Sequence, residues 1–364
     1  MSIMIKNTRD NILLGKDKDV ETHLDAYAML NSDNTQLTFF YDTYKEQRGG
    51  LSIGPFGNED IRWNGHAADI KTVTFDDSFA FFTSLESTAH WFRDCKQLQE
   101  IKGIIHLRTS NVKDMSNMFA GCICLKELNV CNFNTINVKN MAFMFYRCSA
   151  LKKIEVNNFE TENVTDMESM FDGCSALKTL DVSGFDTRQV KNLAFMFNGC
   201  SDLVMIDMCD SDHLKVAIFC VTIDDDGFHT DSAYNMSGMF RNCKSLKQID
   251  ISNFNTSEVK YMNNMFEGCS SIETLDLSMF ATEGCVDMNQ MFSGCSNLKT
   301  IYVSPSWKTS VHDDGRVGMF NDCVNLVGGN GTAYRYFAND LKFAQIDKTD
   351  QPGYFTEKIV SSET

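Results

Sequence analysis

The sequence has no long apolar segment and no excess of positive charge. No run approaches the length of about 18 apolar residues that a membrane-spanning helix requires, so we expect no membrane insertion. Lysine and arginine number 33 against 49 aspartate and glutamate, which gives a formal net charge of −16. Binding to a phosphate backbone depends on clustered Lys and Arg. We therefore expect no nucleic-acid partner.

The N-terminus also lacks the apolar run of a secretory signal peptide. We therefore expect the chain to reside in a virion or in the cytoplasm and not to be conventionally secreted.

Motifs for metal binding and catalysis are missing as well. The chain has no Cys-x-x-Cys pair, and Cys122 and Cys124 lack the partners that a zinc site needs. The 7 histidines stand at unrelated positions, and none forms a His-x-x-x-His pair. We expect no metal, no cofactor, no catalytic residue and no enzymatic activity. A Cys/His hydrolase is the remote alternative, because such residues meet only in the folded chain.

What the sequence does contain is a repeated phrase that ends in cysteine. Nine of its 14 cysteines end the phrase Phe-x-x-Cys, and Met precedes the Phe in eight of them: Cys95, Cys122, Cys148, Cys174, Cys200, Cys243, Cys269, Cys295 and Cys323. Neighbouring cysteines are separated by 27, 26, 26, 26, 43, 26, 26 and 28 residues. A fixed period in the twenties is typical of a solenoid. Identical residues on successive coils point the same way, so we expect buried free thiols instead of disulfides.

Each repeat combines two periodicities. Met167, Met170, Phe171 and Cys174 follow the spacing of one helical stripe, whereas Leu180-Asp181-Val182 alternates as in a strand. The sequence predicts a leucine-rich-repeat-like, right-handed α/β solenoid with one parallel sheet and short helices on the other face. The expected strands are Leu128 to Val130, Ile154 to Val156, Leu180 to Val182, Ile206 to Met208, Ile249 to Ile251, Leu275 to Leu277 and Ile301 to Val303.

A Phe-x-Thr phrase follows several of these strands, for example at Phe185 and Thr187. We expect the phenylalanines to form a buried ladder and the threonine hydroxyls to bind backbone groups of the turns.

The ends of the chain do not repeat. We expect an N-terminal arm or attachment segment over 1–21, a small β-rich N-terminal cap over 22–88, the repeat solenoid over 89–326, and a C-terminal cap and tail over 327–364. Within the N-terminal cap, Gln36 to Tyr41 and Lys71 to Phe75 are predicted strands.

One interval of 43 residues places an insertion at about 210–232. Its alternating apolar residues favour a protruding hairpin. We name Phe219, Asp224, Asp225 and Asp226 as candidate binding residues of this insertion. The acidic run lacks the spacing of a calcium-binding loop, so we expect a solvated turn and not a metal site.

The middle residue of each predicted strand is expected to face outward. These residues form a mostly acidic column, of which the candidate binding residues are Glu155, Asp181, Asp207, Asp250, Asp276 and Tyr302. A row of lysines, such as Lys152 and Lys178, stands three residues before them. The arrangement either compensates charge on a solvated sheet or recognises a partner.

The repeats resemble those of the BspA-like family of bacterial surface leucine-rich-repeat proteins. The residues from Val164 to Thr187 match nearly every step of Val-x-x-Met-x-x-Met-Phe-x-x-Cys-x-x-Leu-x-x-Leu-Asp-Leu-Ser-x-Phe-Asp-Thr, and the likeness covers roughly 22–358. The resemblance implies non-enzymatic adhesion to a protein or glycan on the surface of a host or neighbouring cell. Because the signal peptide is missing, we expect display on a virion or other large assembly, whose structural proteins would bind residues 1–21. An intracellular protein-interaction scaffold is the alternative.

Overall fold

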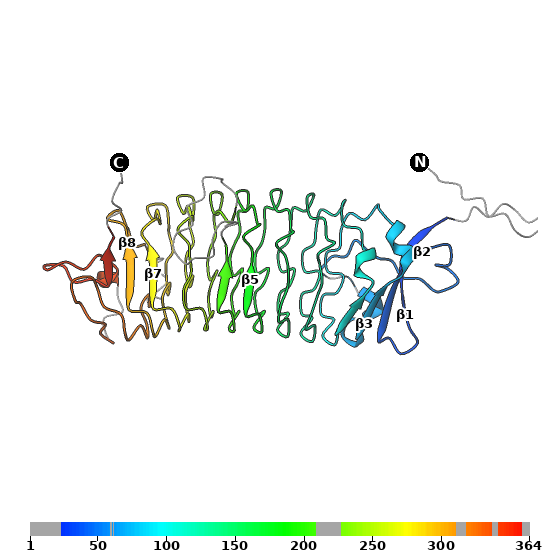
Figure 1. Cartoon of the computed structure of the whole chain (residues 1–364), viewed down its shortest axis with the longest axis horizontal. Coiled ribbons are helices and arrows are strands. Elements are labelled where there is room, and N and C mark those ends of the chain that lie inside the picture. Colours follow the sequence, from blue (N-terminus) through cyan, green and yellow to red (C-terminus); the bar gives the residue numbers. More distant parts are fainter. Residues whose placement is uncertain are drawn as a thin grey trace, which may run out of the picture.

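The computed structural model describes residues 23–58, 60, 62–208, 227–310, 318–336 and 341–358. Its coils stack side by side into an elongated body, with the N-terminal strands at one end (Figure 1). The predicted attachment segment 1–21 and the candidate residues Phe219, Asp224, Asp225 and Asp226 lie outside the described residues. The expected right-handed winding and the domain boundaries stay predictions.

The N-terminal strands form one sheet with the first coil. Strands β1 (Asp25–Leu30), β2 (Gln36–Asp42), β3 (Thr72–Phe75) and β4 (Glu100–Lys102) lie in the order β1-β2-β3-β4. The first pair is antiparallel and the other two are parallel. The two strands predicted in this segment are confirmed. The ring of Phe39 stacks on those of Phe75 and Trp91 at 4.6 and 4.9 Å, which packs these strands against the first coil.

The predicted parallel pairing between coils is confirmed where strands form, but the described strands make several sheets and not the single sheet expected, because pairing along the coils is intermittent. Strands β5 (Thr179–Asp181) and β6 (Met205–Asp207) form one parallel pair, and β7 (Thr274–Leu277), β8 (Thr300–Val303) and β9 (Phe355–Glu357) form another sheet. At the predicted strands 128–130 and 154–156 the coils share one bridge, between Glu127 and Lys153, and 249–251 is not a strand. Three or four residues per coil provide few ladder hydrogen bonds. We call the side formed by β4 to β8 and the equivalent residues of the other coils the strand face.

The predicted short helices are also wrong. The part of the chain that the structure describes contains no α-helix, only the short 3₁₀ helices Arg62–Gly65, Ala67–Asp69, Asp77–Phe81, Ile104–His106 and Leu341–Phe343. The Met-x-x-Met-Phe-x-x-Cys segments are successive turns. Their third and seventh residues, such as Asn117 (φ 57°) and Gly121 (φ 78°), are left-handed, which interrupts a right-handed helix. We call the side formed by these segments the turn face.

Alternate residues of the turn face bind the next coil. The backbone N–H groups of Met115, Asn117, Phe119 and Gly121 donate to the carbonyls of Asn140, Ala142, Met144 and Tyr146 at 2.7–3.0 Å. The intervening N–H groups of Met118, Ala120 and Cys122 donate to the carbonyl three residues earlier. The turn face therefore has regular backbone pairing without an α-helix.

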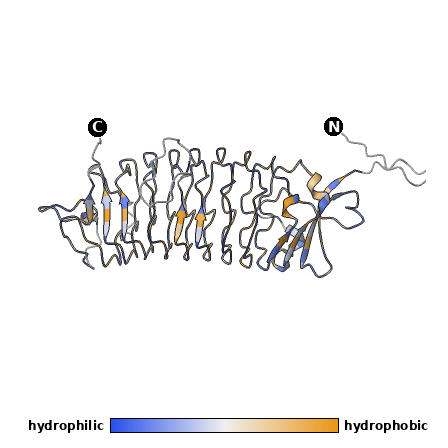
Figure 2. Cartoon of the chain, viewed as in Figure 1, coloured by the Kyte–Doolittle hydropathy of each residue, from blue (hydrophilic) through white to orange (hydrophobic). Residues whose placement is uncertain are grey.

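The core is built from ladders of identical side chains. The rings of Phe145, Phe171 and Phe197 stack at 5.4 and 5.9 Å, and a second phenylalanine ladder includes Phe159 and Phe185 at 6.3 Å. Figure 2 shows polar and apolar residues following one another along β7 and β8, whose apolar members are buried against these ladders. Burial of the phenylalanines is confirmed.

The repeated cysteines are free and buried, as expected. From Cys122 onward, each thiol donates to the carbonyl of the Phe in the preceding coil, at 3.0–3.3 Å between sulfur and oxygen. This weak hydrogen bond gives the repeated spacing of the cysteines a physical reason. Burial raises the pKa of Cys148 to about 12.

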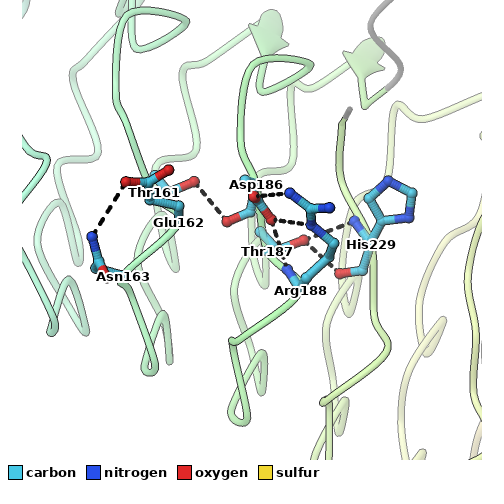
Figure 3. A network of polar contacts seen from close by, with 7 residues as sticks. All are labelled: Thr161, Glu162, Asn163, Asp186, Thr187, Arg188 and His229. Carbon is cyan, nitrogen blue, oxygen red and sulfur yellow. Dashed lines mark hydrogen bonds and ion pairs between the residues drawn. The ribbon is translucent and has the colours of Figure 1, made fainter. Parts of the chain in front are cut away.

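The insertion does not interrupt the stack. The rings of Phe197 and Phe240 lie 5.6 Å apart, as in neighbouring coils. Figure 3 shows the threonine ladder continuing across the gap, where the Thr187 hydroxyl accepts from the backbone N–H of His229 at 2.8 Å and donates to its carbonyl. Phe228 and Thr230 fill the repeated Phe and Thr positions. The repeated positions therefore resume at Phe228, within the predicted insertion of about 210–232, whose bounds stay a prediction.

Candidate functional site

The described members of the predicted binding column share the strand face. Asp181 lies opposite Asp207 in the β5–β6 pair, and Asp276 lies opposite Tyr302 in the β7–β8 pair. Their chain neighbours point into the core, as the alternation of exposed and buried residues shows. Glu155 and Asp250 are exposed on coils where no strand forms.

Three of these carboxylates are bound within their own coil. Asp181, Asp250 and Asp276 each accept from the backbone N–H of the serine two residues later, at 3.0–3.1 Å, and from its hydroxyl at 2.6–2.7 Å. Such bonds stabilise turns. These aspartates therefore have a structural role that the sequence interpretation did not assign.

Lys358 contacts the C-terminal part of the column. Its ammonium group donates to the Asp276 carboxylate and lies 5.9 Å from the centre of the Tyr302 ring. Burial raises the pKa of Asp276, but hydrogen bonds from Lys358 and Ser278 outweigh it and leave the pKa below its usual value. The charge of Asp276 is thus already compensated within the chain.

The N-terminal part of the strand face is hollowed instead. A groove of about 520 Å³ crosses β4 and the next two coils, and Glu100, Ile101, Glu127, Asn129, Lys153 and Glu155 contribute to its lining. The Lys153 ammonium lies 2.6 Å from Glu155, and that of Lys102 lies 3.3 Å from Glu100. Among the predicted candidates that the structure describes, only Glu155 contributes to the lining of this groove.

The sequence interpretation missed Ile101, Lys153 and Met205. Lys153 and Met205 stand two residues before the predicted column and share its outward direction, and the Met205 side chain is 56% exposed. Strand alternation alone would have identified these two. Ile101 could be identified only once the pairing of β4 with β3 was known, because this pairing joins the N-terminal strands to the coil that borders the groove.

The ladder cysteines are poor nucleophiles. Burial raises the pKa of Cys200 beyond the usual range of thiols and holds that of Cys174 well above its ordinary value. A thiol must ionise to attack a substrate, so these cysteines do not support the hydrolase alternative. Among the described residues, no group of three His, Cys, Asp or Glu is arranged to hold a metal ion. The described part of the chain also has no helix of sufficient length and apolarity to cross a membrane.

A family model matches most of the chain. Residues 86–206 and 215–328 match the family described as "Mycoplasma protein of unknown function, DUF285", and these ranges contain all the repeated cysteines. The chain belongs to this family. A comparison with curated proteins found no match.

Several solved structures of bacterial proteins with leucine-rich repeats are similar at low identity. A leucine-rich repeat protein of T. pallidum is 15% identical over 71% of this chain and 91% of that chain, with a TM-score of 0.35. A leucine-rich repeat protein of Bacteroides ovatus is 14% identical over 85% and 94%, with a TM-score of 0.30. A leucine-rich cell surface protein of Faecalibacterium prausnitzii is 16% identical over 87% and 94%, with a TM-score of 0.32. At such TM-scores the likeness does not define the function of this chain.

Proposed function

We propose that this protein is a non-enzymatic recognition module that binds a protein partner on its strand face. The groove between β4 and the next two coils carries the proposal, because it is a hollow of about 520 Å³ lined by both charges and by Ile101. A pocket of this kind offers an apolar contact at its floor and polar groups that fix orientation.

The charges of the groove favour a partner segment of mixed charge. Its lining combines Glu100, Glu127 and Glu155 with Lys152 and Lys153. The ion pair between Lys153 and Glu155 is exposed and therefore weak, so a partner can replace it at little cost. Complementary charge gives specificity and faster association.

The aspartates of the column that lie outside the groove have a structural role. Since Asp181, Asp250 and Asp276 already accept bonds from their own serines, they hold the turns of their own coils in place. We expect substitutions there to weaken binding less than substitutions in the groove.

The resemblance to BspA-like proteins supports adhesion as the setting. The partner would then be a protein of a host or neighbouring cell surface. Display on a virion or other assembly through residues 1–21 belongs to the same proposal, and those residues lie outside the described part.

Site-specific photo-crosslinking tests the proposed surface. A crosslinking amino acid is placed at Asn129 in the groove or at Asn242 on the turn face of the full chain, and surface-labelled host cells are compared with their cytosolic fraction. We expect a specific product from Asn129, reduced about tenfold by Lys153→Glu, and none from Asn242.

The matched control is Lys244→Glu, which changes the same charge at an exposed position outside the groove. Equal capture from both crosslinking positions would contradict the proposed surface. Capture of cytosolic proteins alone would favour the intracellular scaffold.

A further inference from the structure

A second recess lies on the turn face, away from the strand-face groove. It has a volume of about 440 Å³, and its lining includes Arg93, Asn117, Gly121, Phe143, Tyr146 and Arg147. These residues come from three successive coils, and Asn58 of the N-terminal segment joins them. Neither the repeat pattern nor the proposed function accounts for this combination.

The recess lies over a seventh turn-face position that carries no side chain. Gly121 occupies that position between Asp94 and Arg147 on the neighbouring coils, and its φ of +78° suits glycine. A Cβ atom on Gly121 would lie 2.8 Å from the Asp94 carboxylate oxygen and would fill part of the space.

Two bulky residues beside the recess have left-handed backbones. Arg147 has a φ of 56° and Phe143 a φ of 60°. The position of Arg147 is taken by glycine in five other coils: Gly121, Gly173, Gly199, Gly268 and Gly294. The left-handed backbone belongs to the repeat geometry at these positions, but a large side chain is unfavourable in it. Fold stability therefore does not explain why arginine stands at 147.

The side chains around the recess provide positive charge and aromatic surface. The Arg93 guanidinium donates to the Asn58 side chain at 2.6 Å and lies 3.7 Å from the Asp94 carboxylate. The Arg147 guanidinium lies 5.0 Å from the centre of the Tyr146 ring. Phe143 contacts Tyr146 edge to face at 5.6 Å. The lining of the recess holds two guanidinium groups and one carboxylate, and the charge of Arg147 also acts on the Asp172 carboxylate of the next coil.

We propose that this recess binds an acidic sugar, such as the terminal residue of a glycan. The guanidinium fork matches the two oxygens of a carboxylate, which an ammonium group cannot do. The rings of Phe143 and Tyr146 offer an apolar surface to the carbon face of the sugar. The Asn117 amide and the Asp94 carboxylate supply acceptors and donors for its hydroxyls.

Ligand-observed saturation-transfer NMR on the full chain tests the proposal, with N-acetylneuraminic acid and glucuronic acid as probes and galactose as the neutral comparison. We expect transfer to at least one acid and little to galactose. Arg147→Gly should reduce the affinity for the acidic sugar about tenfold or more. It should leave the thermal unfolding temperature unchanged, because glycine suits this backbone conformation. Arg147→Lys retains the charge but loses the fork, so we expect an intermediate loss.

The matched control is Asn242→Gly, which makes the same backbone change at the equivalent position of a distant coil and should leave binding unchanged. Lys153→Glu in the strand-face groove should also have no effect, which separates this site from the proposed protein-binding surface. Absence of transfer to both acids would overturn the proposal. So would unchanged binding by Arg147→Gly, or equally effective competition by acetate, which would indicate a general anion site.

Discussion

The turn face and the strand face have the same sequence period but very different regularity. On the turn face, four backbone hydrogen bonds join neighbouring coils even across the insertion, where Leu193, Phe195, Phe197 and Gly199 donate to Asn235, Ser237, Met239 and Arg241. On the strand face, the described residues pair only within the strands β3 to β9 and at one isolated bridge between Glu127 and Lys153. The backbone hydrogen bonds of the turn face therefore fix how the coils stack, whereas the backbone of the strand face is less constrained from one coil to the next.

Their carboxylates differ in the same way. Burial raises the pKa of Asp172 on the turn face to about 6 and raises the pKa of Glu168 beside it. On the strand face, the hydrogen bond from Lys299 lowers the pKa of Glu273. The turn face thus holds its acids in a drier environment, whereas the strand face compensates them with lysines.

The largest expected difference between the two faces concerns their phenylalanine ladders. Phe171→Ala should lower the free energy of unfolding by about 3–5 kcal/mol, because it removes a buried ring from between two neighbours. Phe159→Ala should lower it by less, because the Phe159 ring lies farther from its neighbours. Its centre is 6.3 and 6.5 Å from the two neighbouring rings, whereas that of Phe171 is 5.4 and 5.9 Å from its neighbours. Urea unfolding of both variants measures the difference. An equal or reversed order would break the comparison.

The cysteines provide a smaller contrast. Cys174→Ala should cost about 1–2 kcal/mol, because it removes buried volume and the bond from sulfur to the Phe145 carbonyl. Cys131→Ala, at an exposed position after the strand face, should change stability by less than about 0.5 kcal/mol. Thermal unfolding under reducing conditions compares them, and a loss at Cys131 as large as at Cys174 would contradict the assignment.

The smallest expected effect is a pH dependence of opposite sign on the two faces. Because the folded-state pKa of Asp172 is raised, its contribution to stability increases as pH falls from about 7 toward 4. Wild type should therefore gain roughly 1 kcal/mol relative to Asp172→Asn between pH 7 and 5.

Asp276→Asn is the matched control on the strand face. The pKa of Asp276 is lowered in the folded chain, so wild type should lose stability relative to this variant as pH falls below about 4. Urea titrations at several pH values measure both differences, and two differences of the same sign would refute the contrast in burial.

The repeat was predictable because identical residues on successive coils form one ladder. Phe171, Cys174 and Thr187 were placed from their spacing alone, and each has the buried or bonded position expected of it. The helices were not predictable. Apolar residues at Met167, Met170, Phe171 and Cys174 satisfy both a helical stripe and a chain of turns with left-handed residues, and sequence spacing does not distinguish the two.

The candidate sites were less accessible to sequence reasoning. Glu155 was found from strand alternation, but the groove also needs Ile101, which depends on pairing between β3 and β4. The Arg147 recess needs Asn58 from a segment outside the repeats. By contrast, Phe228 and Thr230 carried the Phe-x-Thr signal, which the long interval concealed.

The hydrogen bonds between coils of the turn face all run in the same direction, so the two ends of the stack are chemically different. Its N–H groups point toward the C-terminal coil and its carbonyls toward the N-terminal coil, so the two ends require different chemical closure. At the first coil, the indole N–H of Trp63 donates to the carbonyl of Trp91 at 2.8 Å. An interior coil supplies both halves of the pattern itself. Coils can therefore be added or removed in the middle of the stack without altering either end. If the two end segments were exchanged, the N–H donors of an end segment would face the N–H donors of the last coil.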